Sequence, residues 1–135
     1  MSLFIAMSVL ALHGQTQEVF KSRLAPVPID VQMARVVTGH GSVSATLSGN
    51  KLTVNGTFEG LRSGATTADL HQSKITGVSG VRIHELTVSK AMDGAVTGSV
   101  DLTTQEVEAL HKGLLYVFVR SEGAPEGNLW GWLVR

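Results

Sequence analysis

Two stretches near the end of the chain decide the predicted fold: Leu114-Leu-Tyr-Val-Phe-Val-Arg120 and Asn128-Leu-Trp-Gly-Trp-Leu-Val-Arg135. The seven residues between them, 121–127, are all turn or loop formers, so the two stretches predict the strands of one hairpin. Side chains along a strand point alternately to its two faces. Each strand therefore has one aliphatic face, suited to a core, and one aromatic face.

The aromatic face is unusual for a half-exposed sheet, whose outer side is ordinarily polar. Tyr116, Phe118 and Arg120 share this face on the first strand, and Trp130 and Trp132 share it on the second. If the register pairs Phe118 with Trp130, then Tyr116 lies opposite Trp132 and one continuous patch forms. We interpret these five residues as a partner-binding surface. In the alternative interpretation, a loop or the helix covers the aromatic rings inside one domain.

Composition favours an all-β chain with frequent turns. The chain has 135 residues, enough for one domain with a real core; 43% are hydrophobic, 16% are charged and fifteen are glycine. Formal net charge is zero and no basic patch stands out, so nucleic acid is not an expected partner. The absence of cysteine excludes disulfides, thiolate metal sites and cysteine nucleophiles.

Further strands and one helix are predicted upstream of the hairpin. Apolar alternation and turn residues predict strands at 18–24, 35–47, 52–58, 66–71, 81–89 and 95–102. The pattern Thr103-Thr-Gln-Glu106 is a capping box, and it predicts a short helix over 104–112 that ends at Gly113. Eight short strands with one small helix predict a β-sandwich.

Residues 1–14 form an apolar segment that differs from the domain predicted for residues 15–135. The apolar run is about as long as a signal-peptide core and is shorter than the ~20 residues of a membrane-spanning helix. No Lys or Arg precedes it and no clear Ala-x-Ala site follows it, so we leave open a cleaved signal, a retained membrane anchor and an ordinary core element. A retained anchor would contact the membrane through Leu3, Phe4, Ile5, Val9 and Leu10.

Three patches give the chain a family resemblance from Phe20 to Leu133. They are residues 41–47 with 52–61, residues 67–71 followed by Gly77 and Gly80, and residues 113–119 with 125–127 and 131–133. In these patches the chain resembles a CHRD domain, the module named after chordin and common in bacterial secreted proteins. The resemblance implies an antiparallel Greek-key β-sandwich of superoxide-dismutase-like or immunoglobulin-like topology. It also implies a periplasmic or extracellular location, and little about biochemical activity.

The chain departs from the family pattern at a possible metal site. The family usually has His-x-His where this chain has Asp69 and His71, and it tends to have a histidine where this chain has Arg120. Asp69 and His71 keep the same-face spacing that a metal site can use, with His84 as a weak third candidate, but the Arg120 cation would repel a metal ion. We therefore expect no metal and no cofactor. The alternative is a hydrogen-bonded Asp–His or Asp–Arg cluster on the surface.

A second departure supports the interpretation of the aromatic face. Positions that match Phe118, Trp130 and Trp132 are often polar in the family, whereas all three are large aromatic residues here. No arrangement of nucleophile, base and orienting residue stands out in the sequence.

Three functions follow from these observations. The first is a non-catalytic accessory subunit, membrane-associated on the outer side of a bacterial membrane. It would dock on a larger membrane protein complex, of respiratory or photosynthetic type by analogy, through the aromatic face and the apolar N-terminus. The second is a metal-dependent, superoxide-dismutase-like enzyme that uses Asp69, His71 and His84. The third is a soluble secreted binding module.

Overall fold

The structure, a computed structural model, describes residues 16–135. The predicted membrane-contact residues lie outside the described part of the chain: Leu3, Phe4, Ile5, Val9 and Leu10. Within residues 16–135, no helix has both the length and the apolar character needed to cross a bilayer.

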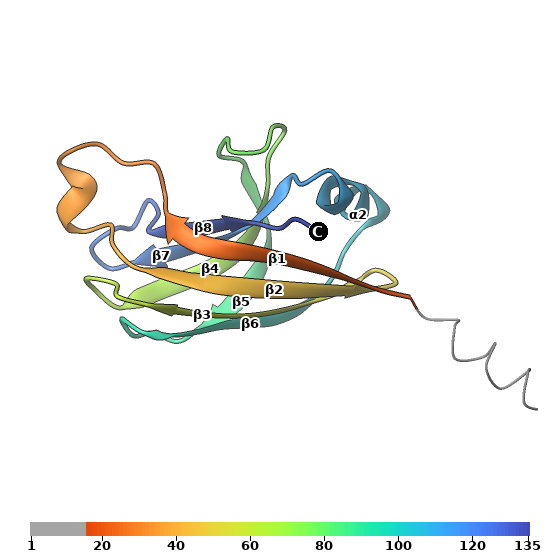
Figure 1. Cartoon of the computed structure of the whole chain (residues 1–135), viewed down its shortest axis with the longest axis horizontal. Coiled ribbons are helices and arrows are strands. Elements are labelled where there is room, and N and C mark those ends of the chain that lie inside the picture. The colour runs from red at the N-terminus through yellow and green to blue at the C-terminus, as the bar shows by residue number, and fades with distance from the viewer. Residues whose placement is uncertain (1–15) are drawn as a thin grey trace, which may run out of the picture.

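The described part contains eight strands, one α-helix and one short 3-10 helix (Figure 1). Their bounds are β1 (Gln17–Pro26), η1 (Met33–Arg35), β2 (His40–Ser48), β3 (Lys51–Glu59), β4 (Ala65–Gln72), β5 (Val81–Val88), β6 (Gly94–Asp101), α2 (Thr104–His111), β7 (Leu115–Ser121) and β8 (Leu129–Trp132). The expectation of an all-β fold with one short helix is confirmed. The predicted strand over 35–47 is wrong at its start, because Gly39 has φ of +105°, outside extended strand geometry, and β2 begins only after it.

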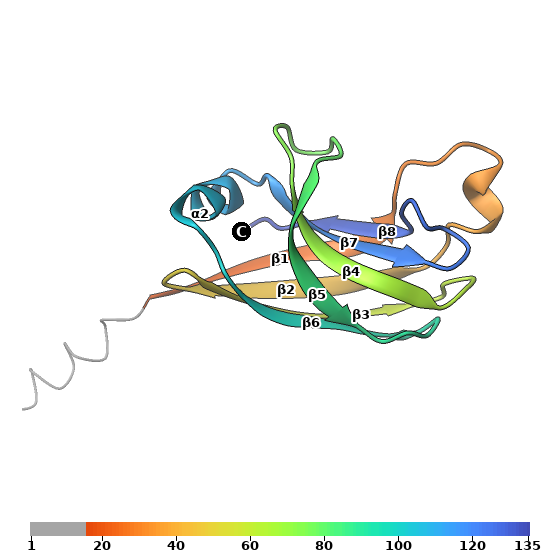
Figure 2. The same ribbon diagram turned by 180° about the vertical axis from the view of Figure 1, so that it is seen from behind.

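The strands form a closed barrel in the order β1-β2-β3-β6-β5-β4-β7-β8, with every neighbouring pair antiparallel (Figures 1 and 2). Strands β4, β5 and β6 follow one another as neighbours, and β7 returns to lie beside β4, which is the spatial order of a Greek key. The expected sandwich of two separate sheets is therefore not what the structure shows, because the two layers are joined at both sides.

Two strands join the layers by changing partner along their length. Strand β1 pairs with β2 as far as Leu24 and then with β8 at Ala25 and Pro26. Strand β5 pairs with β4 as far as Leu86 and then with β6 at Thr87 and Val88. Strands that switch sheets in this way form the corners of a barrel. Both seams are short, so the barrel keeps much of the two-layered character that the sequence predicted.

Helix α2 packs into the core beside one end of the barrel, where Ala109 and Leu110 join the inward side chains of the strands (Figure 1). The predicted capping box is confirmed. The Glu106 amide donates to the Thr103 hydroxyl over 3.1 Å, and the Thr103 amide donates to the Glu106 carboxylate over 3.0 Å. The helix ends at His111, one residue earlier than expected, and Gly113 follows it at φ of +74°.

We predict that Thr103→Ala lowers the free energy of unfolding by about 1 kcal/mol, because the substitution leaves the Glu106 amide without its capping acceptor. Chemical denaturation followed by circular dichroism measures this change. The neighbouring exposed residue offers a matched control, since Thr104→Ala removes the same hydroxyl from the first helical position, where it caps nothing. Equal losses in the two variants would show that the cap does not stabilise the domain.

Candidate functional site

The hairpin register brings the aromatic residues together as expected. Phe118 pairs with Trp130 and Tyr116 pairs with Trp132, so the predicted continuous patch is confirmed. On the other side of β7, the register of β4 places Asp69 opposite Phe118 and His71 opposite Tyr116. Directly paired residues share a face. Because Leu70 and Val117 belong to the buried core, the patch lies on the outer face of β4, β7 and β8.

Tyr116 is the centre of the aromatic cluster. Its ring centroid lies 4.4 Å from that of Trp132, 5.5 Å from that of Trp130 and 5.1 Å from the His71 ring. Tyr116 is buried, with 1% of its surface exposed, whereas the two tryptophans are half-buried. The Gly80 amide also donates to the Tyr116 hydroxyl over 2.8 Å. A loop therefore covers part of the cluster, as the alternative interpretation had it, and the tryptophans remain accessible to a partner.

A buried carboxylate lies beside the aromatic rings. Asp69 is 1% exposed and accepts a hydrogen bond of 3.0 Å from Arg120. The Arg82 guanidinium lies 3.8 Å from the other Asp69 oxygen, and the His71 Nε2 atom lies 3.7 Å from the oxygen that Arg120 contacts. Arg120 in turn lies over the Phe118 ring, 4.9 Å from its centroid. The expected Asp–Arg hydrogen bond is thus present, and a cation stabilises the buried carboxylate.

The structure does not assemble the weak metal candidates. His84 pairs with Leu70, so it lies on the inner side of the sheet, and its Nε2 atom is 2.8 Å from the Glu106 carboxylate. Asp69 and His71 lie on the outer side, where Arg120 occupies the third position. Within residues 16–135, no three potential ligands of the His, Cys, Asp or Glu type gather closely enough to hold a metal ion. The three weak candidates, Asp69, His71 and His84, therefore do not come together in the part of the chain that the structure describes.

Three buried polar atoms on the outer face have no hydrogen-bond partner: Asp69 Oδ1, His71 Nε2 and Trp132 Nε1. The His71 and Trp132 rings pack against the Tyr116 ring, and Asp69 lies beside His71. A buried polar atom without a partner costs roughly 1–3 kcal/mol, so such atoms are uncommon in a folded domain. Burial also lowers the pKa of His71 below its usual value of 6.5; Arg120 adds to this effect and the Asp69 carboxylate opposes it.

We name this surface the docking face, and its members are Asp69, His71, Tyr116, Phe118, Arg120, Trp130 and Trp132. The sequence analysis named all seven, five as partner-binding residues and Asp69 and His71 as metal candidates, but it missed two further contributors. A β-bulge between Leu70 and His71 moves Arg82 opposite His71, and Gly80 approaches from the loop that follows β4. Gly80 belongs to the second family patch, but neither that patch nor a local motif indicated these two contacts, because both depend on the local register of β4 and β5.

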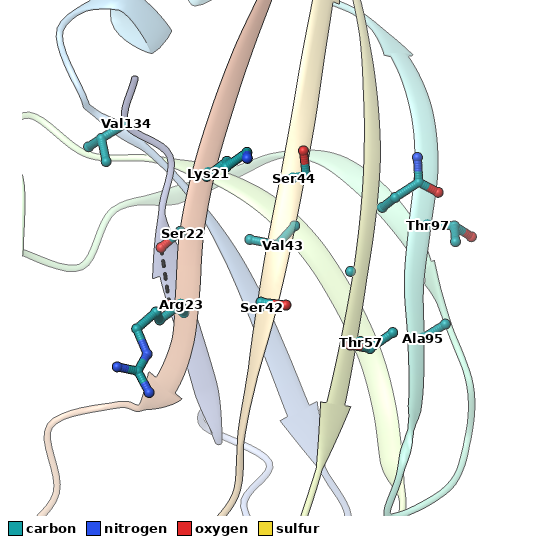
Figure 3. Close-up of a pocket in the computed structure, with 12 residues that line it drawn as sticks. Lys21, Ser22, Arg23, Ser42, Val43, Ser44, Thr57, Ala95, Thr97 and Val134 are labelled. Atoms are coloured by element: carbon teal, nitrogen blue, oxygen red, sulfur yellow. Dashed lines mark hydrogen bonds between the residues drawn. The ribbon is translucent and has the colours of Figure 1, made fainter.

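A wide hollow lies elsewhere, on the outer face of β1, β2, β3 and β6 (Figure 3). It measures about 950 Å³. Two rows of paired residues cross it: Lys21, Ser44, Asn55 and Thr97, and Arg23, Ser42, Thr57 and Ala95. The hollow exists because most of these side chains are small. They are exposed or half-buried, as on an ordinary solvated sheet face, so the hollow gives no specific indication of a ligand.

Fold and docking face together define a small all-β module with a surface suited to binding another molecule. The chain belongs to the CHRD domain family, whose pattern matches residues 20–133. This membership points to an extracellular binding module. No curated protein and no solved structure is similar enough to the chain to count as a match.

The lowered pKa of His71 predicts a stability that falls in mild acid. Between pH 6.5 and the lower pKa of His71 in the folded protein, the His71 side chain binds a proton in the unfolded chain but not in the folded chain. Each step down in pH therefore favours unfolding. For one proton, the free energy of unfolding falls by at most about 1.4 kcal/mol for each pH unit. We expect His71→Gln to lose this part of the pH dependence, as measured by urea denaturation between pH 7.5 and 5.

The comparison of the two proteins at each pH isolates the contribution of His71 to the pH dependence of stability. Parallel stability curves for the two proteins would show that His71 titrates normally and that its burial has no energetic consequence.

Proposed function

We propose that this protein is a non-catalytic, extracytoplasmic binding module that docks on a larger membrane protein complex through the docking face. One observation carries the proposal. The three unpartnered buried atoms lie within a half-exposed aromatic patch, at the place where the sequence independently predicted a partner.

The composition of the docking face supports this proposal. Tyr, Trp, Phe and Arg are the residues enriched at protein interfaces, and together they often supply the few side chains that dominate binding energy. Trp130 and Trp132 are accessible, while Tyr116 and Phe118 below them are buried, so the two indoles rest on a packed aromatic base. A partner that covers the indoles would bury the ring surface that is still exposed in the isolated domain.

Two features support a membrane complex as the partner. The CHRD family points to the outside of the cell. Residues 1–14 are apolar and, if retained, would hold the module at the membrane. A soluble secreted binding module is the alternative, and membrane fractionation of the native host separates the two.

The enzyme alternative needs a bound metal, and we predict that the purified protein holds none at stoichiometric level. Arg120 places a fixed positive charge beside Asp69, and His84 points to the other side of the sheet. Elemental analysis by mass spectrometry measures the metal content after growth with added zinc and copper. Stoichiometric metal that is lost on His71→Ala would overturn this expectation and favour a dismutase-like activity.

We predict that Trp130→Ala and Trp132→Ala each weaken partner binding by about 2 kcal/mol, or about 30-fold, while the isolated domain stays folded. Each substitution removes an accessible ring from the outer face and leaves the aliphatic core of Leu129 and Leu133 unchanged. Affinity purification of the tagged full chain from detergent-solubilised native membranes measures the amount of complex recovered.

Thr57→Ala is a suitable control, because Thr57 is exposed on the opposite layer of the barrel. The expected pattern is a membrane complex that co-purifies with the wild type and the control and is depleted with both tryptophan variants. A strong drop in melting temperature would assign the indoles to the domain's own packing. If the tryptophan variants change neither the amount of membrane complex recovered nor the melting temperature of the domain, the docking face does not bind the partner.

A further inference from the structure

The loop of residues 73–80, between β4 and β5, projects from the barrel and carries exposed aliphatic side chains (Figures 1 and 2, green loop). Ile75 is 64% exposed and Val78 is 53% exposed, and Val81, which follows the loop at the start of β5, is 68% exposed. Single exposed aliphatic residues are common on protein surfaces, but three on one protrusion form an apolar patch that water solvates poorly.

Hydrogen bonds hold this loop in one conformation. At its tip, the Val78 amide donates to the Ile75 carbonyl in a tight turn, in which Gly77 has φ of +89°. The Thr76 hydroxyl donates to the Gly113 carbonyl over 2.8 Å, and the Gly80 amide donates to Tyr116. The aliphatic side chains are thus presented outward by an ordered scaffold, which reduces the entropy lost when they bind.

The charged residues of the loop and of its two flanks in the sequence have a single sign, although Arg82 also lies 3.8 Å from the buried Asp69 carboxylate. Lys74 and Arg82 flank the aliphatic residues, and no Asp or Glu occurs from residue 72 to residue 82. A hollow of about 580 Å³ lies within the loop, lined largely by Ile75, Val78 and Val81 together with small residues. Apolar side chains on a protrusion, bordered by cations, match the layered chemistry of an anionic membrane surface, where acyl chains lie beneath charged headgroups.

We propose that this loop inserts Ile75 and Val78 into the surface of an anionic lipid bilayer, with Lys74 and Arg82 paired to headgroup phosphates. A protein partner would need a pocket shaped to this protrusion, whereas a fluid bilayer accommodates any apolar tip of this size. The inference goes beyond the docking proposal and does not depend on it. Lipid insertion by the loop is also compatible with the docking proposal, because Gly80 joins the loop to Tyr116 of the docking face.

A second loop rises beyond the barrel on the same side in both views (Figures 1 and 2, orange loop). It connects β1 to β2 and includes η1, and its residues Ile29 and Val31 are 41% and 91% exposed. The two loops lie apart in both views, and Asp30 stands between Ile29 and Val31, so the orange loop is not part of the proposed lipid contact.

A single environment-sensitive label tests the insertion directly. The chain has no cysteine, so Ile75→Cys in the full chain can be labelled at one site with a nitrobenzoxadiazole dye. The probes are vesicles of phosphatidylcholine alone and vesicles that also contain 30 mol% phosphatidylglycerol (about a third, a strongly anionic surface). We expect a blue shift and higher emission from position 75 with the anionic vesicles only.

Thr97→Cys is the matched control, because Thr97 is exposed on the opposite layer and should report water in every sample. This comparison separates the loop from any lipid contact made by residues 1–14, which are present in both proteins. Adding Val78→Ser to the labelled protein should weaken the response to anionic vesicles about tenfold, as expected for loss of one inserted aliphatic side chain.

Water-like emission from position 75 in anionic vesicles overturns the proposal, as does an equal response from position 97. An equal response to uncharged vesicles removes the assigned role of Lys74 and Arg82 and overturns the proposal as stated. The vesicles contain no protein, so none of these outcomes bears on the docking face, and failure of the tryptophan variants to affect co-purification leaves this test unaffected.

Discussion

The register of β7 between β4 and β8 is the constraint on which both sides of this barrel depend. Side chains alternate with a period of two, so a shift of one residue would move every core residue of β7 outward and every aromatic residue inward. In the observed register, Val117 and Val119 enter the core while Tyr116 and Phe118 join Trp130, Trp132 and His71 outside. One set of backbone hydrogen bonds therefore specifies the core and the docking face together.

The outer face of β7 is buried almost as completely as the inner face, which is unusual for a barrel strand. Tyr116 and Phe118 are covered by neighbouring side chains and by the residues around Gly80 and Gly127. Gly127 shows how close this contact is, since a Cβ atom placed there would lie 2.6 Å from the Phe118 ring. In the proposed complex, this close packing would lower the entropic cost of association.

Charge on this face is arranged around one buried carboxylate. Asp69 is paired with Arg120 and approached by Arg82, while burial lowers the pKa of His71. Two cations and one anion leave the area with positive character, which continues to Lys74 on the adjacent loop. A buried ion pair contributes little net stability compared with apolar packing, because desolvation offsets the attraction. The pair is better understood as setting the orientation of the arginines beside the aromatic rings.

The sequence by itself determined the eight strands, the capped helix and the face that the aromatic residues of each hairpin strand share, because strand alternation and capping are local rules that act over a few residues. Only the tertiary structure decided that Phe118 pairs with Trp130, that β1 and β5 change partners and close the barrel, and that the bulge after Leu70 places Arg82 opposite His71. It also decided that the loop of residues 73–80 covers Tyr116 while exposing Ile75 and Val78. These features depend on how distant segments meet, and no local pattern in one strand encodes the position of another.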